Sequence, residues 1–300
     1  MARIRRRVAT TIMPPAPGPP KVAILVVNGF DRMGRWGDFN THEARSYPWV
    51  DLCLKQIERH TREMSYLVYV WDNSALPEHR GLLEGRPNVT VLRSEDPDVN
   101  LPHGAALDRL RKKVPARTEF VLTLDTDSFP IRDGWLENLT GRLTGGVLLA
   151  GAWREELVER GLRPFVHPSC LAIRRSTMRE LGVGFLGGQD VGQSVTEAVL
   201  AAGGRISRLR RSNAWNPHFL MGGIYGDLVY HQAAGSRSAR FRLTDESDDD
   251  EVLRCALRNA AFRDLDRLLA VLTGDADPET AAELGLVRGA GAAETGGRRS

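Results

Sequence analysis

Two carboxylates, Asp125 and Asp127, come directly after the apolar run FVLTL. Such a run is typical of a buried strand, so both acids are expected at the mouth of a core, where negative charge costs free energy unless a cation meets it. Hard divalent ions such as Mg²⁺ and Mn²⁺ take carboxylate oxygens and complete their coordination with phosphate and water. The pair therefore predicts a metal site that also meets a phosphate group.

Two further apolar runs end in polar residues. KVAILVVN closes with Asn28, and SYLVYVWDNS contains Asp72 near its end. Ligands of an open parallel sheet bind beyond the carboxyl ends of the strands, so these two side chains are expected to join Asp125 at one nucleotide site. The competing interpretation is that Asp and Asn cap strands and begin turns in any protein.

The elements that must position these residues alternate between strand-like and helix-like runs. This alternation predicts an α/β fold: a doubly wound, mostly parallel mixed sheet flanked by helices, with right-handed crossovers. The expected strands are residues 21–28, 65–74, 88–94, 119–127, 146–153, 168–175 and 226–231. The expected helices are residues 47–60, 104–114, 133–143, 191–204 and 251–272.

Composition sets the broad class. The 300 residues carry a net charge of +3, which is too mild to indicate a nucleic-acid partner. The three cysteines are odd in number and contain no CxxC pair, which argues against a disulfide framework or zinc knuckle and favours a cytoplasmic protein. No apolar run approaches the roughly 18–20 residues of a membrane span. The sequence thus predicts an ordinary globular protein.

The chain is expected to hold one folded domain with three appendages. The arginines of the N-terminal arm offer a weak contact to an anionic membrane surface, although a solvated tail is the competing interpretation. The C-terminal helix is a candidate surface for an oligomer. The expected parts are a disordered basic, proline-rich arm (1–20), the α/β domain (21–244), an acidic connector with a C-terminal helical extension (245–285) and a disordered tail (286–300).

Six segments, in order, resemble the family-2-like glycosyltransferases of the GT-A fold. VLTLDTDSFPIRDGWLENL resembles the DxD segment of that family, and WDNS resembles its strand-end Asp, which recognises the nucleotide base. NLPHGAALDRL and PSCLAIRRSTMRELG are similar to the segments before and after the metal strand, although Leu107 stands where an arginine is expected. GGQDVGQSVTEAVLAAGGRI resembles the segment whose Asp opens a helix, and LVYHQAAGSR resembles the late histidine segment.

The resemblance implies a metal-dependent enzyme. It would transfer a sugar from a nucleoside-diphosphate sugar to a hydroxyl or amine acceptor, with inversion at C1. In this scheme Asp127 binds Mn²⁺ or Mg²⁺, Asp125 reaches the ribose or the metal, and His231 is a third metal ligand. Asp190 is the general base, whose competing interpretation is an ordinary helix N-cap.

The remaining site residues have weaker signals. Asn28 and Asp72 are expected at the nucleotide, and Arg237 at its phosphates. The acceptor or the sugar is expected to contact three side chains: Trp153, Gln189 and Trp215. Gln189 and Gly192 depart from the family pattern, which has acids at both positions, so contacts to the acceptor are expected to differ.

Three other functions compete with transfer. LTLDTDSF also resembles the nucleophile segment of haloacid-dehalogenase-like phosphatases, in which Asp125 would attack phosphorus and Asp127 would act as acid and base. That chemistry needs a downstream lysine, but the last lysine of the chain is Lys113. A pyrophosphorylase would need a glycine-rich loop with lysine after the first strand, and the chain lacks one. A non-catalytic protein that binds nucleotide sugars is the third alternative.

Overall fold

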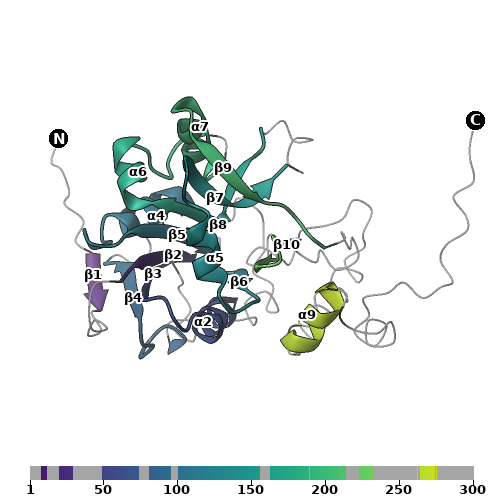
Figure 1. The fold of residues 1–300 in the computed structure, drawn as a ribbon. Coiled ribbons are helices and arrows are strands. Elements are labelled where there is room, and N and C mark those ends of the chain that lie inside the picture. The colour runs from purple at the N-terminus through teal and green to yellow at the C-terminus, as the bar shows by residue number, and fades with distance from the viewer. Residues whose placement is uncertain are drawn as a thin grey trace, which may run out of the picture.

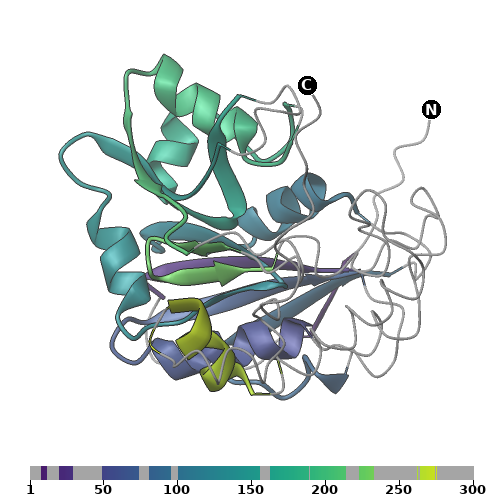
Figure 2. The ribbon, with the colours of Figure 1, turned by 90° about the vertical axis from the view of Figure 1, so that its right-hand side faces the viewer.

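The computed structural model describes residues 8–11, 20–29, 49–73, 81–95, 101–155, 163–188, 190–213, 223–232, 262, 264–273 and 275. Within this part of the chain an eight-stranded sheet lies at the centre, and helices cover both of its faces (Figures 1 and 2). A second, three-stranded sheet lies beside it. No helix among the described residues is long and apolar enough to cross a membrane.

The main sheet has the strand order β1-β4-β3-β2-β5-β8-β7-β9. Strands β4, β3, β2 and β5 pair in parallel, β8 runs antiparallel to both β5 and β7, and β9 is parallel to β7. The carboxyl ends of β2 to β5, β7 and β9 therefore share one edge of the sheet with the amino end of β8. The strands are β1 (Val8–Thr11), β2 (Val22–Asn28), β3 (Tyr66–Asp72), β4 (Val89–Ser94), β5 (Phe120–Asp125), β7 (Val147–Arg154), β8 (Phe165–Arg174) and β9 (Arg205–Leu209).

Alternating side chains of the strands fill two cores, one on each face. On one face, Ile24 and Leu122 pack with helices α2 (Trp49–His60) and α5 (Trp135–Gly141). On the other, Leu25 and Val121 pack with helices α4 (His103–Arg111), α6 (Arg175–Glu180) and α7 (Gln193–Ala201). Both faces of the central strands are buried, which explains their continuous apolar runs.

The small sheet joins β6 (Ser128–Pro130), β11 (Val229–His231) and β10 (Gly223–Tyr225) in antiparallel pairs. Its register places His231 opposite Ser128, so the late histidine lies directly beside the segment that follows Asp125. Phe129 and Tyr230, the next pair in this register, stack with their ring centroids 5.1 Å apart. Helix α9 (Leu265–Thr273) packs there through Leu268 and lies beside α2 (Figure 1).

The predicted mixed, mostly parallel sheet with flanking helices is confirmed. The sequence alone does not mark four short elements, β6, β9, β10 and α6, because three to six residues often carry too little periodicity to be recognised. The arm expected to be disordered contributes β1, whose VATT sequence is rich in β-branched residues and pairs antiparallel with β4. Most of the expected 251–272 helix lies outside the described residues.

Candidate metal centre and active site

Asp125 and Asp127 lie where β5 leaves the main sheet and the chain turns into β6. Asp125 ends β5 and its side chain is 17% exposed, whereas Asp127 is buried. The backbone N–H of Gln232 donates to the carbonyl of Asp127 at 2.9 Å, which ties the turn to the end of β11. Both acids are therefore held by backbone pairing at the edge where the parallel strands end.

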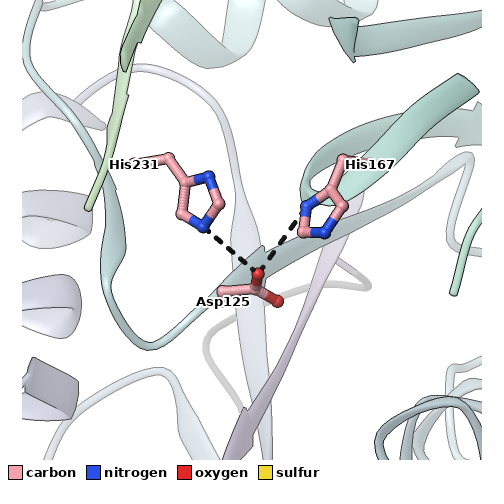
Figure 3. Close-up of side chains that lie close together, drawn as sticks. All are labelled: Asp125, His167 and His231. Atoms are coloured by element: carbon pink, nitrogen blue, oxygen red, sulfur yellow. Dashed lines mark ion pairs between the residues drawn. The ribbon is translucent and has the colours of Figure 1, made fainter. Parts of the chain in front are cut away.

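Three imidazoles face these acids. Nε2 of His231 lies 3.6 Å from Oδ2 of Asp125 and 3.7 Å from Oδ1 of Asp127. Nδ1 of His167, from β8, lies 3.8 Å from Oδ2 of Asp125, which Figure 3 shows between the two rings. Nε2 of His103, from α4, lies 3.4 Å from Oδ1 of Asp125. These five side chains are called the Asp125 cluster below.

Short polar contacts fix the strands that carry the cluster. The hydroxyl of Ser128 donates to the carbonyl of Ser169 at 2.5 Å and lies 3.1 Å from that of Tyr230, so β6, β8 and β11 meet at one buried side chain. The N–H of Ser169 donates to Nδ1 of His167 at 3.1 Å, which orients that ring. The rings of His167 and His231 stack with centroids 5.3 Å apart.

His103 owes its position to Asn73, the residue after β3. The Asn73 side chain accepts the N–H of Leu101 at 3.1 Å and donates to the carbonyl of Leu101 at 2.9 Å. The indole N–H of Trp71 also donates to Asn73 at 2.8 Å. This two-way pairing of a side-chain amide with a backbone unit imitates a strand pair, and it fixes the start of α4 against the end of β3.

Burial and charge set the protonation of the cluster. Burial lowers the pKa of His231 well below its ordinary value, and the positive charges of Arg154 and Arg211 lower it further. The ring is therefore neutral, the form that binds metal. Burial likewise raises the pKa of the Cys53 thiol, and the negative charges of Asp127 and Asp125 add to this shift. The acids thus create a negative potential that reaches α2.

The donor set fits a divalent cation. Asp125, His167 and His231 each offer an atom such that all three atoms lie within 4.8 Å of one another. Carboxylate oxygens suit Mg²⁺ and Mn²⁺, and neutral imidazole suits the transition metals, so the mixed set favours an ion that accepts both. His167 was missed as a ligand by the sequence reading, since it lies on an antiparallel strand and in no recognised metal motif.

Asp72 lies in a different environment at the same edge. Its side chain is 0% exposed, and its two oxygens accept hydrogen bonds from Nδ2 of Asn28 at 2.9 Å and Nε of Arg93 at 2.7 Å. Arg93 belongs to β4, the next strand in the sheet. The structure thus brings Asn28 and Asp72 together, but it turns the Asp72 carboxylate toward the protein.

Asp190 lies in the segment that leads into α7. Its Oδ1 accepts the N–H of Val191 at 2.7 Å, and the N-cap of the helix is Gly192, at φ 93°, rather than Asp190. A Cβ on Gly192 would lie 2.5 Å from the carbonyl oxygen of Val166. The close contact that glycine permits brings the Asp190 segment against the backbone next to His167.

Asp108 of α4 holds the chain that precedes Asp190. Its carboxylate accepts the N–H groups of Phe185 at 3.1 Å and Leu186 at 3.2 Å. A Cβ on Gly184 would lie 2.6 Å from Oδ1 of Asp108, so only glycine allows this approach. Helix α4 therefore contacts both Asp125, through His103, and the loop that leads to Asp190.

The expected sugar and acceptor contacts are only partly described. Trp153 is 6% exposed; its indole N–H donates to Glu155 at 3.2 Å, and the guanidinium of Arg208 lies 4.3 Å from the ring centroid. Gln189, Trp215 and Arg237 lie outside the described residues.

The comparisons with known proteins found similarity of structure only. No protein-family model and no curated protein sequence matches the chain. The mannosyltransferase PcManGT from Pyrobaculum calidifontis, solved with GDP-Man and Mn²⁺, is 16% identical, with 90% of this chain and 79% of that chain covered and a TM-score of 0.46. TarS (1–349) from S. aureus, solved with UDP-GlcNAc, is 13% identical, with 84% and 71% covered and a TM-score of 0.45. The 4-diphosphocytidyl-2C-methyl-D-erythritolsynthase from Anaerococcus prevotii is 9% identical, with 79% and 95% covered and a TM-score of 0.47.

Proposed function

We propose that the chain is a metal-dependent glycosyltransferase that moves a sugar from a nucleoside-diphosphate sugar to a hydroxyl or amine acceptor, with inversion at C1. The observation that carries the proposal is the Asp125 cluster, in which two carboxylates and three imidazoles meet at the strand edge that also holds Asn28. The ordered series of sequence motifs supports the same reaction.

Asp125, Asp127 and His231 would hold Mn²⁺ or Mg²⁺, with His167 as an added ligand. The bound ion would balance the negative charge that grows on the departing diphosphate. His103 contacts the Asp125 oxygen opposite the two other imidazoles, so its role is to fix that carboxylate. The nucleotide would lie beyond β2 and β3, with Arg237 near its phosphates and Asn28 near the base, oriented by Asp72.

Asp190 would take the proton of the acceptor as the sugar is transferred. The Val191 N–H bonds one of its oxygens and so fixes the direction of the carboxylate. Its segment lies against the backbone beside His167, which supports a base close to the proposed metal site. Three aromatic or amide side chains complete the proposal as sugar or acceptor contacts: Trp153, Gln189 and Trp215.

Nucleotide binding tests the proposal without knowledge of the acceptor. Calorimetry with UDP, GDP and dTDP, each with and without Mn²⁺, is expected to show binding of at least one nucleotide that depends on the ion. A panel of nucleotide sugars, followed by nucleotide release, then identifies the donor. Nucleotide binding that does not depend on Mn²⁺, together with phosphate release from p-nitrophenyl phosphate, would favour the phosphatase instead.

The base is tested by Asp190→Asn. Loss of a general base lowers turnover by ~10²–10⁴-fold, whereas the affinity for nucleotide and Mn²⁺ is expected to stay unchanged. Glu180→Gln, which alters an exposed acid at the end of α6, is the matched control and is expected to retain full turnover. Normal turnover in Asp190→Asn would show that another group accepts the proton.

A further inference from the structure

Two arginines reach the same sheet edge as the Asp125 cluster. Arg154 is the last residue of β7, and Arg211 follows β9 by two positions. Because β8 is antiparallel to both β5 and β7, and β9 is parallel to β7, the carboxyl ends of β5, β7 and β9 point the same way. Both arginines are therefore delivered to the end of the sheet at which Asp125 lies.

His231 separates the acids from the guanidinium of Arg154. Its Nε2 faces Asp125 and Asp127, as described above, whereas Nη1 of Arg154 lies 3.5 Å from its Nδ1. The two ring nitrogens thus meet opposite charges. The site has an acidic side and a basic side, with one neutral imidazole between them.

Arg211 comes to the basic side through the small sheet. It forms an antiparallel bridge with Tyr225 of β10, and the N–H of Ser212 donates to the carbonyl of Ile224 at 2.8 Å. Strand β10 pairs in turn with β11, which carries His231. Nε of Arg211 donates to the carbonyl of Asn213 at 3.3 Å, which holds its guanidinium beside the end of β9.

We propose that Arg154 and Arg211 bind the diphosphate of the sugar nucleotide on the basic side of His231, opposite the acids that hold the metal. The inference rests on the proposed function and adds two cationic side chains to Arg237 as contacts of the diphosphate. A metal–diphosphate complex carries positive charge at the ion and negative charge on the outer phosphate oxygens, which matches the divided polarity of the site. Arginine suits the second part because its planar fork bonds two phosphate oxygens at once.

Inorganic pyrophosphate is the probe, because it carries the diphosphate without a base or a sugar. Calorimetry measures the binding of Mn²⁺ alone and then the binding of pyrophosphate in saturating Mn²⁺. The proteins compared are wild type, Arg154→Gln and Arg211→Gln. Each substitution is expected to weaken pyrophosphate binding by about tenfold or more, as for loss of a charge-assisted hydrogen bond. Neither substitution is expected to weaken the binding of Mn²⁺ alone. Arg154→Gln is expected to strengthen that binding, because a repelling charge near the ion is removed.

Arg175→Gln is the matched control, since Arg175 begins α6 beyond the opposite end of β8 and bonds the carbonyl of Ala116. It is expected to change neither measurement. Unchanged pyrophosphate affinity in both site variants would overturn this inference alone. Equal weakening of Mn²⁺ and pyrophosphate would also overturn it, because that pattern indicates general damage to the fold. Wild-type protein that binds Mn²⁺ but no pyrophosphate would instead contradict the proposed function.

Discussion

Asp72 and Asp125 end the two strands that flank β2, and the fold answers their negative charges in different ways. The register of the sheet sets Asp72 opposite Asn28 and Asp125 opposite Val27, so the two acids lie at nearly the same level of one edge. Asp72 is fully buried and bonded by the guanidinium of Arg93. Asp125 is 17% exposed and faces imidazoles.

The difference lies in what each partner supplies. A guanidinium carries a permanent charge, so the charge of Asp72 is balanced within the fold and its hydrogen bonds orient Asn28. A neutral imidazole supplies a lone pair but no charge, so His231 does not balance the charges of Asp125 and Asp127. We expect a cation from solution to balance them. Acids at equivalent strand ends are therefore expected to serve stability in one case and ligand binding in the other.

The largest expected effect separates the two acids by metal affinity. Asp125→Asn removes a charged ligand but keeps the shape of the side chain, so Mn²⁺ affinity should fall by more than the ~10–100-fold typical of an outer-shell partner. Asp72→Asn should cause a much smaller loss. Calorimetry with Mn²⁺ measures both, and Glu58→Gln, an exposed acid of α2, is the control. Equal losses in the Asp72 and Asp125 variants would remove the distinction.

Stability should change in the opposite order. Asp72→Asn leaves Arg93 without its buried carboxylate and is expected to lower the free energy of unfolding by about 3 kcal/mol, at the low end for a broken buried pair because Arg93 is 23% exposed. Asp125→Asn without metal should cost little or even stabilise, since it removes repulsion between neighbouring acids. Urea denaturation measures both, with Glu180→Gln, an exposed acid of α6, as control. A stable Asp72→Asn protein would show that the ion pair is dispensable.

The sequence predicted the acidic half of the site because one rule governs it. Parallel strands end at one edge, so apolar runs closing in Asn28, Asp72 and Asp125 had to converge there. His231 came from its motif alone, and the structure explains its placement through the pairing of β11 with β6. Nothing in the sequence marks β6 as a strand, since three residues carry no pattern.

The rest of the site depends on contacts between segments far apart in the chain. Arg93 neutralises Asp72 across two neighbouring strands, and 21 positions separate them, a spacing that no local pattern encodes. His167 enters from an antiparallel strand that was expected to begin at residue 168, one position too late to include it. His103 depends on the side chain of Asn73 holding Leu101. Tertiary pairing, rather than periodicity, decides these positions.

His103 offers an intermediate test of how imidazoles support Asp125. His103→Gln removes the ring that faces Oδ1, so Mn²⁺ affinity should fall by about tenfold, the lower range for a group that orients a ligand. His60→Gln is the matched control, because His60 also contacts an acid, Asp133. His60 is the last residue of α2, which leads to the amino end of β3, away from the cluster. Loss of Mn²⁺ affinity in the control, or none in His103→Gln, would contradict the role.

The smallest expected effect concerns the loop that α4 holds for Asp190. Asp108→Asn replaces one acceptor oxygen by an N–H₂ group that meets a backbone N–H, so one of the two bonds to Phe185 and Leu186 is lost. Hydrogen exchange should accelerate in residues 184–190 while Mn²⁺ affinity stays unchanged. Asp264→Asn is the control, because it alters a carboxylate that accepts the N–H of Arg267 in α9. It should leave the hydrogen exchange of residues 184–190 unchanged. Unchanged exchange in Asp108→Asn would mean that packing of Phe185 alone fixes the loop. Helix α4 would then position Asp125, through His103, without also positioning the loop that leads to Asp190.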